Sequence, residues 1–77
     1  MKNFIVVMEC EEEDTPNYMT ETGWCADIAE AELFGIDDAL DAAESAASGW
    51  YAETDWYIWI GIAGPTRAEH FQDYYPK

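Results

Sequence analysis

The fold is decided by residues 36–48, with the sequence IDDALDAAESAAS. The apolar residues of this segment recur at the spacing of one face of an amphipathic helix, namely Ile36, Leu40, Ala43 and Ala47. Asp37 and Asp38 fall in the expected first turn, where the helix dipole favours negative charge. Gly35 precedes the segment as a candidate N-cap, and Gly49 follows it as a stop signal. The pattern therefore predicts a helix over 36–48, and its many alanines predict a slim helix that lies flat on a sheet.

Segments rich in β-forming residues lie on both sides of this helix. Residues 4–10 contain the apolar run FIVVM, which favours a strand. Residues 53–62 contain WYIWI, five consecutive large β-forming residues. A strand formed by this segment would be apolar on both of its faces. We therefore expect 53–62 to form a central strand of the sheet, or a strand with one face in an interface.

A turn signal, TPN at 15–17, follows the first strand. A hairpin about residues 16–18 would place Cys10 and Cys25 near opposite positions. Two cysteines cannot form a disulfide framework, and no secretory signal is visible, so we expect free buried thiols.

Two further segments complete the predicted fold. Residues 27–33 alternate loosely and favour a strand, although their alanines and glutamates also permit a helix. The tail at 67–77 predicts either a short last strand or a packed arm. We expect a single α+β domain over residues 1–77, a small antiparallel sheet of order β-β-α-β with one helix packed on one face.

The charge of the chain is large and unevenly distributed. The 77 residues include 17 Asp and Glu but three Lys and Arg, which gives a formal net charge of −14. The cations are Lys2, Arg67 and Lys77, so residues 3–66 hold 15 of the acids and no Lys or Arg. A hydrophobic content of 49% favours folding over disorder. Charge of this sign excludes direct binding of nucleic acid or of an anionic membrane, and favours a positively charged partner.

No catalytic motif stands out. The single histidine, His70, has its nearest serine at Ser48, and negative charge disfavours a thiolate at Cys10 or Cys25. The chain lacks a glycine-rich phosphate loop, and we expect it not to be an enzyme.

We also expect no metal and no other cofactor. The acidic run at 11–14 matches no calcium-binding loop. The longest apolar run, 56–64, is about half of what a transmembrane helix requires, and we expect a cytoplasmic protein.

The acidic residues fall into rows on two predicted elements. In a strand, Glu9, Glu11 and Glu13 would share one face, with carboxylates roughly 6.7 Å apart, and Glu30 and Glu32 would do the same. On the helix, Asp37, Asp41 and Glu44 would lie on the face away from the core, in steps of about 5–6 Å. The predicted partner-binding set comprises Glu9, Glu11, Glu12, Glu13, Asp14, Asp37, Asp38, Asp41 and Glu44. Such rows can imitate the field of duplex phosphates, which are spaced about 3.4 Å apart along each strand.

Small size, a cation-free acidic surface and the predicted β-β-α-β plan resemble the phage-encoded anti-defence proteins that act as DNA mimics, anti-CRISPR and anti-restriction inhibitors. The resemblance lies in composition and in the elements at 4–10, 27–33, 36–48 and 56–62. It implies an inhibitor, in the host cytoplasm, that occupies the positively charged nucleic-acid site of a defence effector such as a CRISPR complex. The alternative is an acidic interaction module, or a regulator, whose basic partner is unrelated to nucleic acid.

Overall fold

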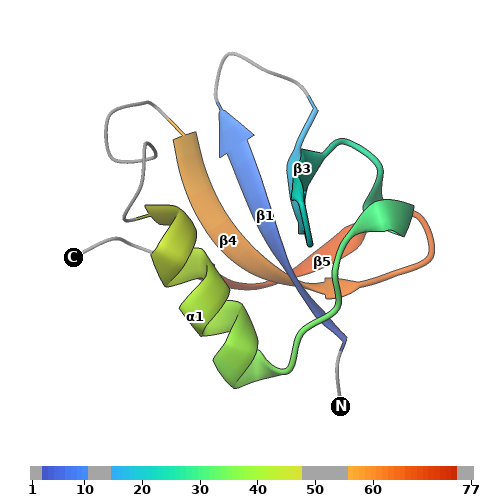
Figure 1. Cartoon of the computed structure of the whole chain (residues 1–77). Coiled ribbons are helices and arrows are strands. Elements are labelled where there is room, and N and C mark those ends of the chain that lie inside the picture. Colours follow the sequence, from blue (N-terminus) through green and yellow to red (C-terminus); the bar gives the residue numbers. More distant parts are fainter. Residues whose placement is uncertain (1–2, 11–14, 48–55, 75–77) are drawn as a thin grey trace.

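The computed structural model describes residues 3–10, 15–47 and 56–74 (Figure 1). Along the chain its elements are β1 (Phe4–Cys10), β2 (Asn17–Thr20), β3 (Gly23–Cys25), the short 3₁₀-helix η1 (Ile28–Glu30), α1 (Ile36–Ala47), β4 (Trp56–Ala63) and β5 (Ala68–Tyr74). The strands form one antiparallel sheet of order β3-β2-β1-β4-β5. The predicted α+β class and the antiparallel sheet with a helix on one face are therefore confirmed. The predicted β-β-α-β order is wrong, because three strands precede α1 and two follow it.

The long central pair β1–β4 builds the middle of the sheet. Its register runs from Phe4 opposite Ile62 to Cys10 opposite Trp56. The central strand predicted at 53–62 is confirmed from Trp56 onward, and residues 53–55 lie outside the described part. The predicted last strand is β5, which pairs with β4 along the outer side of the sheet.

The extra strand arises because the chain turns back between β2 and β3. The Thr20 hydroxyl donates to the Gly23 carbonyl at 3.2 Å, and the Thr22 amide donates to the Thr20 hydroxyl at 3.3 Å. Gly23 has φ +152°, a conformation that side chains rarely adopt. The turn at Thr20–Gly23 therefore divides residues 17–25 into two strands.

The hairpin about residues 16–18, which would have placed Cys10 and Cys25 near opposite positions, is not formed. β1 meets β2 with Val7 opposite Tyr18, so the connection lies earlier in the chain than the predicted turn at 16–18. The backbone of Cys10 pairs with Trp56 in β4, and that of Cys25 pairs with Tyr18 in β2. Cys25 is free and half-buried, so the expectation of a buried thiol is wrong for this residue.

The strand predicted at 27–33 is wrong as well, because local turn bonds form instead. The Asp27 carboxylate accepts from the Ala29 amide at 3.0 Å, and the Asp27 carbonyl accepts from the Glu30 amide at 3.0 Å. These bonds cap and close η1. The chain then returns to the sheet, where Phe34 exchanges two backbone hydrogen bonds with Phe4.

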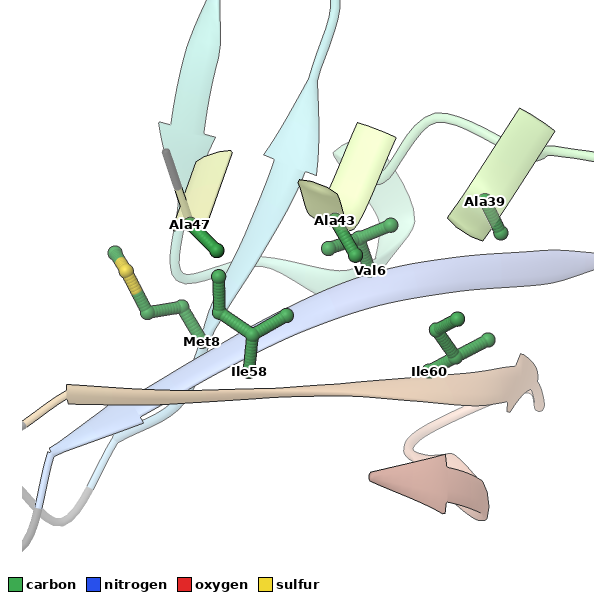
Figure 2. Packing of buried hydrophobic residues seen from close by; sticks show 7 residues of the cluster. All are labelled: Val6, Met8, Ala39, Ala43, Ala47, Ile58 and Ile60. Carbon is green, nitrogen blue, oxygen red and sulfur yellow. The ribbon is translucent and has the colours of Figure 1, made fainter. Parts of the chain in front are cut away.

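α1 begins at Ile36 as predicted and is described to Ala47, so Ser48 and Gly49 lie outside the described residues. The Gly35 carbonyl accepts from the Ala39 amide at 2.9 Å, as expected of an N-cap residue. The stripe of buried residues on α1 consists of Ala39, Ala43 and Ala47, whose methyl groups point at the sheet (Figure 2). Ile36 and Leu40 flank this stripe and are half-buried. The small alanines let the helix approach the sheet closely, so the larger side chains lie at its margins.

Apolar residues pack on both faces of the sheet. Under α1 the buried strand residues are Val6, Met8, Ile58 and Ile60 (Figure 2). On the opposite face Ile5, Val7 and Tyr18 are buried, with Ile28, Ala31 and Trp59 packed against them. The helix therefore covers one face of the sheet, and the segment around η1 helps to cover the other.

Candidate functional site

The acidic residues of α1 form one exposed row. Asp37, Asp38, Asp41 and Glu44 are all solvent-exposed, on the side of the helix away from the buried alanines. Helix geometry places Asp41 about 6 Å along the axis from Asp37, and Glu44 about 4.5 Å further. The structure thus brings together the four helical members of the predicted partner-binding set, and we call them the α1 row.

The sheet holds the α1 row in a fixed position. Ala39 and Ala43 are fully buried against the first apolar cluster, and Ala47 is 4% exposed. A helix anchored over three successive turns cannot rotate its carboxylates away from solvent without exposing this core. The row is therefore a rigid negative surface.

Glu9 lies apart from the α1 row. Strand alternation places it on the same face as Ile5 and Val7, opposite the helix. Its carboxylate accepts a hydrogen bond from the Tyr57 hydroxyl of the neighbouring strand. Burial of Tyr18 and, secondarily, the negative charge of Glu9 raise the pKa of Tyr18 above its usual value. Glu9 thus belongs to an aromatic cluster on the second face, and the structure does not join it to the α1 row.

The remaining predicted site residues, Glu11, Glu12, Glu13 and Asp14, lie outside the described residues. In the part that the structure describes, Arg67 is the single Lys or Arg, and it lies in the exposed β4–β5 connection. From residue 3 to residue 47, the described segments carry nine acids without a cation. Among the described residues, no Lys or Arg on α1 or on the segments before it offsets the negative charge of the α1 row.

A second acidic feature was not predicted from the sequence. A groove of about 680 Å³ lies between the β2–β3 hairpin and residues 30–33, and Glu21, Glu30 and Glu32 line it together with Trp24. The strand predicted at 27–33 would have placed Glu30 and Glu32 along a flat sheet. The spacing of Asp27 and Glu30 is that of a helix capping box, a sequence signal that could have indicated the turn instead.

The thiol of Cys25 and the imidazole of His70, two side chains that could take part in catalysis, lie far apart in the sheet. Cys25 lies on β3 and His70 on β5, the two edge strands, with three strands between them. His70 instead contacts Asp73, with Nε2 and Oδ1 2.8 Å apart, and its ring lies beside that of Trp59. Within residues 3–10, 15–47 and 56–74, no three His, Cys, Asp or Glu side chains are grouped so that they could hold a metal ion. The positions of Cys25 and His70 on opposite edges of the sheet therefore keep these two side chains apart.

Comparisons with known proteins assign no relative. No protein-family profile matches the chain, and no curated protein or solved structure is significantly similar to it. Among the described residues, neither helix has the length and hydrophobicity needed to cross a bilayer.

Proposed function

We propose that this protein is a DNA-mimic inhibitor, which binds the positively charged nucleic-acid site of an effector and so blocks DNA binding. A defence effector, such as a CRISPR complex, is the proposed target class. The observation that carries the proposal is the α1 row: four exposed carboxylates on a helix fixed to the sheet by three buried alanines.

Physical chemistry supports this use of the row. Like charges three and four residues apart destabilise a helix, so the row weakens the element that carries it. A phosphate-binding groove supplies Lys and Arg side chains that remove this repulsion on binding. Association with such a groove is accelerated by long-range attraction and weakens as salt screens it.

The test begins with affinity capture from bacterial cells that carry a CRISPR or restriction system. The wild-type protein serves as one bait and the Asp41→Asn/Glu44→Gln variant as the other. A protein that is captured by the wild type but depleted with the variant is then bound to a short fluorescent DNA duplex. We expect added wild-type protein to release the duplex in proportion to its occupancy of the target.

A matched control separates the α1 row from total charge. Glu69→Gln/Asp73→Asn also removes one Glu and one Asp charge, from exposed positions on β5. This variant should release the duplex as the wild type does, whereas Asp41→Asn/Glu44→Gln should require about tenfold more protein. Capture of a basic partner that keeps its duplex would favour the alternative, an interaction module unrelated to nucleic acid.

A further inference from the structure

The groove beside η1 is lined by both acidic and apolar side chains. Glu21, Glu30 and Glu32 supply carboxylates, while Trp24 and Leu33 supply apolar surface. Its volume of about 680 Å³ falls in the range of about 300–1,000 Å³ that is typical of small-ligand sites. The groove is therefore large enough to receive a side chain, and three acidic residues contribute to its lining.

The apolar part of the groove is open to a ligand. Leu33 is 49% exposed, one of three large apolar side chains on the described surface with such exposure. Trp24 is half-buried and packs against the cluster under α1, so its position is fixed by the core. Leu33 and Trp24 therefore leave apolar surface on the wall of the groove that a ligand can cover.

The charge of the lining determines what fits. None of the described residues that line the groove is Lys, Arg or His, so positive charge on a ligand complements the carboxylates. An arginine side chain matches both the charged and the apolar parts of the lining. Its guanidinium pairs with carboxylates and stacks on an indole, and its methylene stem covers apolar surface.

We propose that this groove binds an arginine side chain presented by an extended basic segment of a partner protein. The proposal deepens the proposed function, on which it rests for the identity of the partner, by naming a second contact beside the α1 row. Its chemistry can be tested without nucleic acid or effector, so the two proposals fail separately.

The probe is an acetylated and amidated peptide of six arginines, titrated into isotope-labelled protein and followed by two-dimensional NMR. We expect the largest shifts at the Trp24 indole and at the amides of 20–25 and 30–33. A hexa-lysine peptide should bind several-fold more weakly, because ammonium neither stacks nor pairs in a bidentate manner. A hexa-citrulline peptide should not bind.

Matched variants then separate the groove from general attraction. Glu21→Gln/Glu30→Gln should weaken hexa-arginine binding about fivefold or more, whereas Glu69→Gln/Asp73→Asn, with equal loss of charge, should change it less than about twofold. Both pairs lie at exposed positions, although Asp73→Asn also alters the contact with His70, and the same spectra check that both variants are folded.

Three results would overturn the proposal: equal weakening by both variants, shifts centred on α1, or equal affinity for the lysine and arginine peptides. Concentration-dependent shifts at the groove without peptide would also overturn it, because a second copy of the chain would then be the occupant. Saturable shifts with calcium chloride alone would assign the groove to a metal.

Trp24→Phe should retain binding and Trp24→Leu should lose it. Where Trp24→Leu does not fold, the paired carboxylate variants decide alone.

Discussion

Asp41 is surrounded by like charge on its own helix. Asp37 and Asp38 precede it by four and three residues, Glu44 follows by three, and all four side chains are exposed. Each such pair destabilises a helix by a few tenths of a kcal/mol. Asp41 therefore reduces the stability of the free protein, and its proposed role lies in the complex.

We predict that Asp41→Asn raises the free energy of unfolding by about 0.5 kcal/mol while weakening partner binding. Urea denaturation at low salt measures the first effect. Asp38→Asn is the control, because it also removes a charge but loses the favourable interaction of the first turn with the helix dipole. A gain in stability from Asp38→Asn as large as that from Asp41→Asn would contradict this explanation.

The raised pKa of Tyr18 predicts that the folded protein loses stability at alkaline pH. Its pKa is raised in the folded protein, first by burial and then by Glu9. The folded state therefore holds the phenolic proton more tightly than the unfolded chain does. The resulting stability is complete below the unfolded pKa near 10 and is lost as pH rises through the folded pKa.

The measurement compares the wild type with Tyr18→Phe, by urea denaturation at a series of pH values from 8 upward. Tyr18→Phe cannot titrate at this position, so the difference between the two proteins should change as pH passes about 10. Parallel curves over the whole range would show that Tyr18 does not contribute to the alkaline loss.

At the scale of elements, the contact between α1 and the sheet depends on small side chains. Ala43 is fully buried at the centre of the alanine stripe (Figure 2). We predict that Ala43→Leu lowers the free energy of unfolding by about 1–3 kcal/mol, because the added carbons have no space between helix and strands. Ser45→Leu, at an exposed position of the same helix, should change it by less than about 0.5 kcal/mol. Equal effects would mean that the helix does not pack through this stripe.

The elements that the sequence predicted well are those with a strong local pattern. α1 starts at the predicted residue, and the runs FIVVM and WYIWI both form strands. At 27–33 the loose alternation competed with a capping pattern, and the hydrogen bonds of Asp27 favoured η1. The hairpin register could not be predicted, because it depends on which backbone groups β1 shares with β2 and β4.

The same distinction between local patterns and long-range pairing applies to the candidate site. The 3.6-residue period of the helix predicted that the α1 row faces solvent. This prediction requires only the helix and the position of its buried face. The position of Glu9 required knowledge of the strand pairing that brings Tyr57 beside it. The groove depends on the turn at Thr20–Gly23 and on η1 together, two features that lie in separate parts of the sequence.

For the whole molecule, a net charge of −14 predicts opposite effects of salt on folding and on binding. Screening reduces the repulsion within the free protein, so its melting temperature should rise between about 0.05 and 0.5 M sodium chloride. The same screening should weaken the complex with its basic partner by at least about tenfold. Magnesium chloride at equal ionic strength is the control, and a much larger rise in melting temperature with magnesium would indicate site binding instead of screening.

The central claim is that the α1 row competes with nucleic acid for a positively charged site. The most direct measurement is the fluorescence anisotropy of a labelled duplex on the captured target, followed as the wild type, Asp41→Asn/Glu44→Gln or Glu69→Gln/Asp73→Asn is added. We expect the wild type and the β5 variant to release the duplex at similar concentrations, and the α1 variant to require about ten times more protein. A duplex that stays bound while the wild-type protein saturates the target would contradict the claim.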